Sequence, residues 1–401
     1  MTTETRTTQV DEPSLSSARV ASAAIATTIG SVIPVFLMGG LAVQIIGELG
    51  MSATQLGLVV SLYFAVSGIT SIACGRAIER FGIVTGAYWG IGISAAAMIG
   101  IAAFAHSFLA LALLMVFAAP ANGLGQLSAN AILATYGPKH RKGVLFGLKQ
   151  ATIPLSTMLA GISVPLIALT IGWRWAFVAA ALVALAAIPH LWPIPDKRNG
   201  HSPSTGATAK SKVMSPAILV MTVATFAAAT AATPTGSFLA DYATQAGVSA
   251  GLAGLNLTLG GLFGVVARTF VGWIADRKGG IDPLLMMTGL LAVGAAGLAM
   301  FTVSAHWVIP VATILSFGFG WSWPGLLNFA IAGRYPAAPA AATGVTQTGV
   351  YLGGSLGPLG FGLLVDHSGY SSAWWAVAIC MVVAAVLVEI GRYMLNQQAS
   401  S

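Results

Sequence analysis

The sequence predicts an all-α membrane protein with twelve transmembrane helices in two pseudo-symmetric six-helix bundles. Hydrophobic residues make up 56% of the 401 residues and charged residues only 7%, which is too apolar for a soluble protein. Apolar runs of about 20 residues, long enough to cross the hydrocarbon of a bilayer, occur twelve times along the chain. A helix satisfies its own backbone hydrogen bonds in lipid, so each run is expected to be helical.

Each expected span follows from one apolar run, and polar segments separate the runs. The long connection at 194–213 is rich in Ser, Gly, Pro and Lys, so we expect a cytoplasmic linker there. It divides the chain into bundles at 21–193 and 214–396, with tails at 1–20 and 397–401. The expected spans are 21–46, 54–75, 83–105, 109–135, 144–170, 174–193, 214–241, 251–274, 283–303, 308–332, 342–366 and 372–395.

An internal repeat with an offset of 197 positions relates the two expected bundles. A pattern of glycine, acid, arginine and glycine occurs once in each, as Gly75, Glu79, Arg80 and Gly82 and as Gly272, Asp276, Arg277 and Gly279. The same offset joins Gly50 to Gly247, Gly147 to Gly344, Gln150 to Gln347 and Gly172 to Gly369. Two equivalent halves imply a pseudo-twofold axis along the membrane normal, with a shared substrate site between them.

Positive charge is concentrated on one side of the expected membrane. Of the 18 Lys and Arg residues, 15 fall on the side that holds both termini, and only Arg174 falls in an external loop. By the positive-inside rule we expect a multi-pass protein of the inner (plasma) membrane with both termini in the cytoplasm. The net charge of +7 is therefore a topogenic bias and does not indicate a nucleic-acid partner.

Over essentially its whole length the chain resembles the major facilitator superfamily. The resemblance is carried by Gly75-x3-Glu79-Arg80-x-Gly82, by its repeat Gly272-x3-Asp276-Arg277-x-Gly279, and by Gly172-Trp173-Arg174-Trp175-Ala176-Phe177. It implies twelve helices, transport by alternating access, and a gate at the two loop patterns. A carboxylate at the cytoplasmic mouth can hold a helix N-terminus or a basic residue until rocking breaks the contact. The expected gating residues are Gly75, Glu79, Arg80, Asp276 and Arg277; the alternative is that these charges only keep the helix ends out of lipid.

Two basic residues, Lys149 and Arg268, remain inside the expected spans. An ionised side chain at helix depth costs roughly 2.5 to 3.5 kcal/mol on insertion scales, so it normally faces a cavity or marks function. Of the 11 acidic residues only Glu389 lies within an expected span, and Arg392, three residues later, is its expected partner. Asp241 is placed at an external span end. The interior is therefore expected to carry two positive charges and no central carboxylate.

This imbalance favours an anionic substrate as the missing counterion. Lys149 and Arg268 are each about six residues from a cytoplasmic span end, a shared depth of roughly 9 Å, and the resemblance makes their helices neighbours. Ala267-Arg268-Thr-Phe-Val-Gly272 is similar to the helix 8 stretch of monocarboxylate transporters, where the Arg binds the substrate carboxylate, but Gly264 stands where those carriers often have an Asp. The chain thus resembles bacterial monocarboxylate and organic-anion carriers. The alternative is that both side chains snorkel to the interface.

Other polar and aromatic residues complete the expected site. Gln150 and Gln347 occupy equivalent places on expected helices 5 and 11, where amides either face a cavity or join helices. Trp321 and Trp323 are two positions apart on expected helix 10, so only one can line a pocket. The expected substrate-binding residues are Arg268, Lys149, Gln150, Gln347, Trp321, Trp323, Asn256 and Tyr351.

The sequence favours a transporter over an enzyme. It has no metal-ligand spacing, nucleotide loop or nucleophile beside a base, so neither an enzyme nor a cofactor is expected. The preferred function is secondary transport of a small organic anion, such as a monocarboxylate, by proton symport or anion exchange, with Lys149 as the candidate proton carrier. Drug or cation efflux is the alternative, although expected helix 1 offers only Gln44 and a terminal Glu48. A non-transporting membrane sensor is an alternative of another class. The expected partners are the substrate, protons if transport is symport, and the lipid bilayer.

Overall fold

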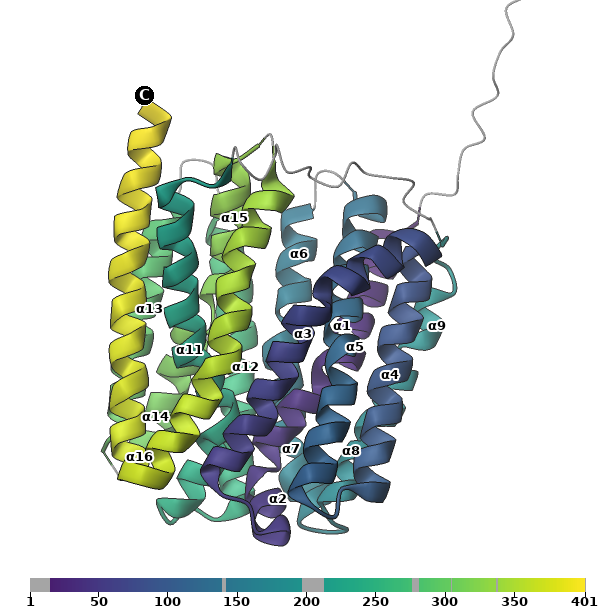
Figure 1. Ribbon diagram of the computed structural model, residues 1–401, viewed down its shortest axis with the longest axis vertical. Helices are drawn as coiled ribbons and strands as arrows, with labels where there is room; N and C mark the ends of the chain where they lie inside the picture. Colours follow the sequence, from purple (N-terminus) through teal and green to yellow (C-terminus); the bar gives the residue numbers. More distant parts are fainter. Residues whose placement is uncertain are drawn as a thin grey trace, which may run out of the picture.

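The structure is a computed structural model that describes residues 15–138, 142–196, 213–275, 281–303, 305–336 and 338–400. These residues form helices and turns, with no strand among them. Figure 1 shows the helices side by side, running between two ends of the molecule. The end that carries the C-terminus, uppermost in Figure 1, is called the upper end, and the opposite one the lower end.

The helices of the first half gather on one side of the molecule, purple to blue in Figure 1. Capping residues set several of their starts; Ser52 and Gln55, for example, form a reciprocal capping box at the start of α3. The elements are α1 (Ser17–Gly40), α2 (Ala42–Leu49), α3 (Ala53–Phe81), α4 (Ile83–Phe104), α5 (Phe108–Tyr136), α6 (Lys142–Gln150), α7 (Thr152–Ser163), the π-helix η2 (Val164–Ala168), α8 (Trp173–Leu185) and α9 (Ile188–Leu191).

The helices of the second half lie on the other side, green to yellow in Figure 1. The longest, α16, contains one residue with non-helical dihedral angles, Gly369 (φ 80°, ψ 171°), where the chain turns back at the lower end. A positive φ of this size is readily adopted by glycine. The elements are α11 (Pro216–Gln245), α12 (Ala250–Ala275), α13 (Pro283–Met300), α14 (Val308–Leu315), the π-helix η3 (Ser316–Gly320), α15 (Trp323–Arg334) and α16 (Pro339–Ser400).

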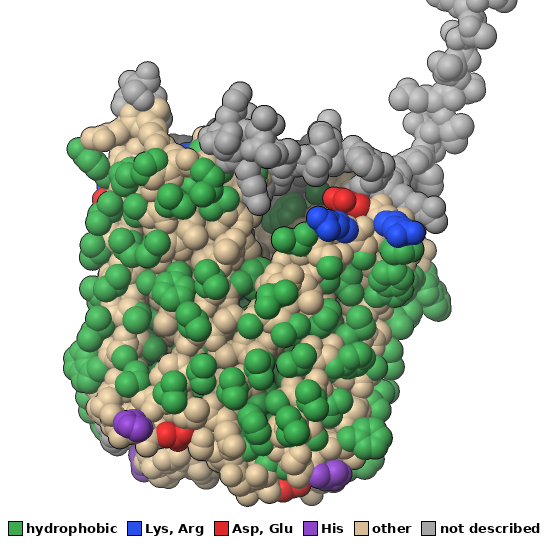
Figure 2. Space-filling view, viewed as in Figure 1, with side chains coloured by type: hydrophobic (Ala, Val, Ile, Leu, Met, Phe, Trp, Pro, Cys, Tyr) green, Lys and Arg blue, Asp and Glu red, His purple; other side chains and the backbone are tan. Residues whose placement is uncertain are grey.

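Ten of the described helices are long and apolar enough to cross a membrane. The candidate at Ala341–Gln398 has 58 residues, about twice what a bilayer needs, and the turn at Gly369 divides it. The segment α14–η3–α15 is not among the ten, because the helical run is broken at Trp321 and Ser322, between η3 and α15. The expected count of twelve spans stays a prediction. Figure 2 shows charged side chains near the upper and lower ends and an apolar surface between them.

The two halves meet closely toward the lower end, where α1 packs on α11. A Cβ added to Gly39 of α1 would lie 2.0 Å from the carbonyl oxygen of Gly236 on α11, so the two backbones touch with no room for a side chain. Gly39 and Gly236 are themselves 197 positions apart, the offset of the sequence repeat. The repeat therefore brings one residue against its own counterpart.

Two further backbone contacts between the halves are related to each other by the same offset. On one side, a Cβ added to Gly57 of α3 would lie 2.2 Å from the carbonyl oxygen of Pro358 on α16. On the other, a Cβ added to Gly254 of α12 would lie 2.8 Å from the carbonyl oxygen of Gly161 on α7. Gly57 and Gly254 are 197 positions apart, as are Gly161 and Pro358. Equivalent helices thus make equivalent contacts.

A carboxylate joins the halves at the lower end as well. Asp366 of α16 accepts hydrogen bonds from the first two backbone N–H groups of α3, with Oδ1 3.2 Å from the nitrogen of Ala53 and Oδ2 2.8 Å from that of Thr54. Helix N-termini carry unsatisfied donors and favour a negative charge. The lower end is therefore held closed by both packing and a charge on a helix terminus.

Candidate functional site

Lys149 is enclosed near the end of α6. Its side chain is only 3% exposed, and its ammonium donates to Oε1 of Gln126 on α5. The hydroxyl of Thr152 donates to the Lys149 carbonyl at 2.6 Å, in the short break between α6 and α7. The amide of Gln126 is neutral, so this contact orients the ammonium without cancelling its charge.

Arg268 lies on α12 and is 8% exposed. Its guanidinium donates to two backbone carbonyls: Nε and Nη2 reach the oxygen of Trp321 at 3.1 and 2.7 Å, and Nη1 reaches the oxygen of Gln150 at 2.6 Å. Trp321 belongs to the same half as Arg268, whereas Gln150 belongs to the other half. One side chain therefore joins the two halves through their main chains.

Breaks in the helices make these two carbonyls available. Gln150 is the last residue of α6, and the residue four positions later is Pro154, which has no N–H to donate to it. Trp321 stands between η3 and α15 and so lies within neither helix. An unpaired buried carbonyl is costly, and the arginine removes that cost at both breaks.

The structure brings Lys149 and Arg268 together, since the guanidinium binds the carbonyl of the residue that follows Lys149. Within the described ranges, neither cation forms an ion pair with a carboxylate. Carbonyl and amide dipoles satisfy donors but carry no net charge, so the positive charge of the site stays uncompensated. We call Lys149 and Arg268 the cation pair.

The two candidate tryptophans are both buried, in different surroundings. The indole N–H of Trp321 donates to the Ala232 carbonyl of α11, and its ring contacts Phe317 and, across the halves, Phe36 of α1 at centroid distances of 5.1 and 6.2 Å. Trp323 is 2% exposed, and its indole nitrogen has no hydrogen-bond partner among the described residues. Of the two, Trp321 is the one in contact with the cation pair.

The remaining substrate candidates lie apart from the cation pair. Asn256 is buried and donates to the hydroxyl of Thr313 at 2.8 Å, a contact within the second half. Tyr351 of α16 is half-buried and packs over Gly68 of α3. Gln347 is half-buried on α16. In the part of the chain that the structure describes, no hydrogen bond joins Asn256, Tyr351 or Gln347 to either cation.

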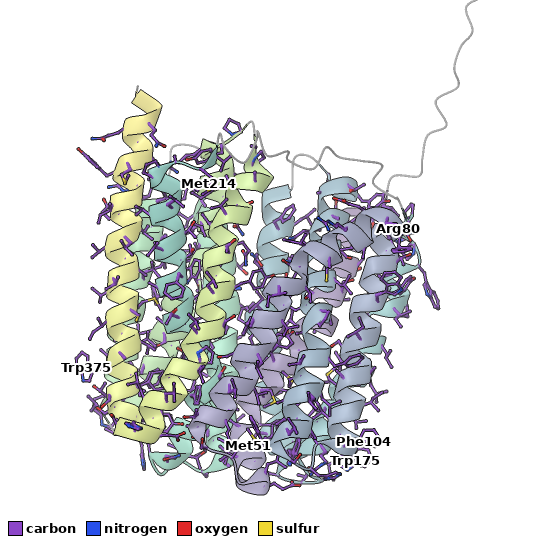
Figure 3. All side chains as sticks on the ribbon, viewed as in Figure 1. Met51, Arg80, Phe104, Trp175, Met214 and Trp375 are labelled. Atoms are coloured by element: carbon purple, nitrogen blue, oxygen red, sulfur yellow. The ribbon has the colours of Figure 1, made fainter. Side chains whose placement is uncertain are left out.

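The first copy of the loop pattern is exposed at the upper end. Glu79 and Arg80 are both exposed, and the guanidinium of Arg80, labelled in Figure 3, lies 5.1 Å from the ring centre of Phe81. Gly75 is half-buried on α3. The expected gating residues of the second copy, Asp276 and Arg277, lie outside the described residues.

The carboxylate that binds a helix start beside the first copy is Asp196, which sequence reasoning placed in a loop without a role. Its Oδ1 accepts from the backbone nitrogen of Val84 at 2.8 Å and its Oδ2 from the hydroxyl of Thr85 at 2.6 Å, at the start of α4. A Cβ at Gly82 (φ 118°) would lie 2.3 Å from that carboxylate. The glycine of the pattern is thus required by both its dihedral angle and this close approach.

Among the acidic residues, one predicted contact is confirmed and one residue is more buried than the sequence indicated. Glu389 accepts from Nε of Arg392 at 3.1 and 3.0 Å, so the predicted salt bridge within α16 is confirmed. Asp241, expected at an external span end, lies near the end of α11 at the lower end of the molecule, where it is buried and only 6% exposed. Gln126 was not among the site residues predicted from the sequence. Its signal is an amide inside the apolar run of α5, a residue type that forms hydrogen bonds between membrane helices.

Comparisons with known proteins agree with this architecture. Residues 15–358 match the family model described as Major Facilitator Superfamily. A Putative tartrate transporter of Agrobacterium vitis is 25% identical over 291 residues, 64% of each chain. Multidrug resistance protein MdtG of Escherichia fergusonii is 31% identical over 163 residues, 38% of this chain and 39% of that protein. MdtG of Salmonella arizonae is 30% identical over 156 residues, 37% and 38% of the two chains. The chain thus matches less than two thirds of the length of each of these relatives.

Proposed function

Because the chain belongs to the major facilitator superfamily, we propose that this multi-pass membrane transporter works by alternating access and carries a small organic anion, such as a monocarboxylate, by proton symport or anion exchange. The observation that carries the proposal is the cation pair, Lys149 and Arg268, buried together with no carboxylate partner among the described residues. Buried charge normally requires a counterion, and an anionic substrate supplies it.

The cation pair has hydrogen-bond donors to spare for a carboxylate. A guanidinium carries five N–H donors, and three of those of Arg268 are occupied by carbonyls. An ammonium carries three, and one of those of Lys149 is occupied by Gln126. Charge-assisted hydrogen bonds to a carboxylate are the strong kind, so these free donors suit an anionic ligand. Since Arg268 also binds Gln150 across the halves, an anion at this site acts on both halves.

The contacts between the halves support the expected organisation. We assign residues 21–193 and 214–396 to two pseudo-symmetric bundles of six helices, with a linker at 194–213. The repeated contacts of Gly57 and Gly254 favour this assignment, because equivalent residues make them. The positive-inside rule favours the upper end as cytoplasmic, with both termini there. Figure 2 shows the surface hollowed between the halves at the upper end, whereas the lower end is closely packed. We therefore propose that the structure represents the state in which the lower, external end is closed.

The relatives favour two substrate classes. The Putative tartrate transporter matches the larger part of this chain, and its printed name specifies an organic anion. The MdtG proteins match a shorter part and are named for multidrug resistance, so drug efflux is the alternative. The uncompensated positive charge of the cation pair favours the anion, since a cationic drug in the same place would be repelled.

A thermal-shift screen of the purified protein against carboxylates, inorganic anions and cationic drugs tests the substrate class. We expect organic anions to raise the melting temperature of the wild type. Lys149→Gln removes one charge and should weaken that anion about tenfold, equivalent to about 1.4 kcal/mol. Gln126→Glu, which gives Lys149 a carboxylate partner, should weaken it similarly. Arg19→Gln, a change at an exposed arginine, is the matched control and should bind as the wild type does.

Transport itself is measured by uptake of radiolabelled monocarboxylates into proteoliposomes, which Arg268→Ala should abolish. Arg268 also stabilises two helix breaks, so Lys149→Gln serves as the second variant. Stabilisation by cationic drugs and not by anions, or wild-type uptake with a neutral residue at 268, would show that the cation pair does not bind the transported substrate.

A further inference from the structure

Three polar or aromatic positions at the lower end occur in both halves with the repeat offset of 197. Gln44 and Glu48 in the first half correspond to Asp241 and Gln245 in the second, so acid and amide have exchanged places. An aromatic donor accompanies each acid, Trp173 in the first half and Tyr370 in the second, and these two are also 197 positions apart. The two copies therefore share an architecture and differ in where the negative charge lies.

In the first half the acid is paired and close to water. The Glu48 carboxylate accepts from the indole N–H of Trp173 at 2.6 Å and forms an ion pair with Arg174. The side chain of Glu48 is 47% exposed. Water and a cation therefore both stabilise the charged form of this carboxylate.

In the second half the acid is buried and lacks a cation. Asp241 is 6% exposed on α11, and its Oδ2 accepts from the hydroxyl of Tyr370 and, at 3.3 Å, from the amide of Gln245. Ser371 occupies the position equivalent to Arg174. Within the described ranges no lysine or arginine pairs with Asp241, and no hydrogen bond is made to its Oδ1.

The groups around Asp241 do not compensate its charge. From α16 the facing groups are the Tyr370 hydroxyl and the carboxylate of Asp366, which is near enough to repel a second negative charge. On α11 itself the Tyr242 hydroxyl is committed to the carbonyl of Phe301. Beyond the end of α11, the ring of His306 bonds to the Ala246 carbonyl.

We propose that Asp241 is a proton-binding site of this protein. Taking a carboxylate out of water without a cation is costly, and binding a proton removes that cost by making the group neutral. The new O–H bond forms at Oδ1, and the donors from Tyr370 and Gln245 remain on Oδ2. The net charge of the pair Asp241 and Asp366 becomes less negative by one, because the proton comes from hydronium in the surrounding water, whose O–H bond breaks as the new one forms.

The position of Asp241 connects this proton to the contact between the halves. Tyr370 directly follows Gly369, where α16 turns, and Asp366 on the other side of that turn binds the first N–H groups of α3. A change in charge at Asp241 therefore acts on the carboxylate that holds the lower end closed. Coupling of this proton to anion movement rests on the proposed function, whereas proton binding at Asp241 does not.

Infrared difference spectroscopy of the full-length protein in liposomes, without added anion, tests the site. Acidification of the wild type should produce the carbonyl band of a protonated, buried carboxyl group, and Asp241→Asn should lack it. Glu48→Gln neutralises the acid of the first half and should retain the band. Tyr370→Phe, which removes one donor but not the acid, should also retain it. If Asp241→Asn does not fold, Asp241→Glu keeps a carboxyl group and should move the band to a different frequency.

Three results would overturn the assignment. They are a band that persists unchanged in Asp241→Asn, a band that does not move in Asp241→Glu, and no such band in the wild type. Thermal shifts with organic anions on the same samples separate this result from the proposed function. Asp241→Asn leaves the cation pair intact, so it should still be stabilised by anions. A wild type that shows the band but gains no stability from anions would count against anion transport and not against proton binding.

Discussion

Arg268 makes hydrogen bonds with three of its donors, yet within the described residues its positive charge has no counterion. Carbonyl oxygens of Gln150 and Trp321 occupy three of its donors, because Pro154 and the interruption at η3 leave those oxygens without helical partners. Neither carbonyl carries a net charge. The same side chain can therefore stabilise two helix breaks and still attract an anion, and these two roles respond differently to substitution.

Substitution of Arg268 separates its structural contribution from its charge. Arg268→Ala leaves two buried carbonyls unpaired, so we expect a loss of unfolding free energy of about 2 to 5 kcal/mol. Arg268→Lys keeps the charge but loses the planar fork that reaches both carbonyls, so it should melt between the alanine variant and the wild type. Thermal unfolding in detergent measures both, with Arg19→Ala as a matched exposed control expected to melt as the wild type does. An alanine variant as stable as the wild type would contradict the role assigned to the carbonyl contacts.

At the scale of the element, paired helix ends hold the lower end of the first half together. Arg174 lies over the ring of Trp173 at 4.4 Å, binds the Ala105 carbonyl at 2.8 Å, and pairs with Glu48 of α2. The hydrogen bond from Arg174 lowers the pKa of the Glu48 carboxyl below its ordinary value, with a further contribution from the Trp173 donor and despite partial burial. The start of α8, the end of α4 and α2 are joined by this one group of side chains.

The stability that Glu48 contributes should depend on pH in a defined direction. Because its pKa is lower in the folded protein, the contribution is present at neutral pH and is lost as the pH falls through the folded pKa. The carboxylate is half exposed, so the effect is small: Glu48→Gln should lower the melting temperature at neutral pH by on the order of 1 °C. The difference between the two proteins should shrink on acidification. A difference that grows at low pH would contradict the assigned sign.

The sequence predicts the positions of these elements well but not their interruptions. The run at 144–170 reads as one span by hydropathy, yet the structure divides it into α6, α7 and η2, and the run at 308–332 is divided by η3. Hydropathy records which side chains are apolar, whereas a break depends on the register of main-chain hydrogen bonds. Pro154 was the local signal for the first break, but nothing near it in the sequence indicates that Arg268 would donate a hydrogen bond to the freed carbonyl.

The candidate site was predictable to the extent that it depends on residue type. Lys149 and Arg268 stood out as charges inside apolar runs, and the structure brings them together. The burial of Asp241 was not predicted, because its hydrogen-bond partner Tyr370 lies 129 positions away in the sequence. Gln126 was missed for the same reason, since its role appears only when α5 lies beside α6. Residue patterns do not predict which residues, far apart in the sequence, will be in contact.

At the scale of the whole molecule, the repeat and the contacts between halves express one symmetry. Two residues related by a twofold axis can touch each other only where the axis passes between them. Gly39 and Gly236 are equivalent in the repeat and are in contact, which is the contact that the proposed twofold axis predicts. The two backbones touch here with no room for a side chain, so opening of the lower end would have to separate them.

A side chain at Gly39 should therefore open the lower end. The Cβ of Gly39→Ala would lie 2.0 Å from the Gly236 carbonyl oxygen and 2.9 Å from the Cα of Ser237, and backbone atoms cannot move aside as a flexible side chain can. The halves must separate there, which exposes Ser237, now 5% exposed.

The rate at which a thiol reagent modifies a cysteine at position 237 measures this opening. With Cys74 and Cys380 replaced by Ala, the reagent should modify Ser237→Cys about tenfold faster in Gly39→Ala, for a shift of about 1.4 kcal/mol between closed and open forms. Gly47→Ala, where a Cβ meets nothing within 4 Å, is the control and should leave the rate unchanged. Equal rates in both variants would mean that the contact between Gly39 and Gly236 does not hold the lower end closed.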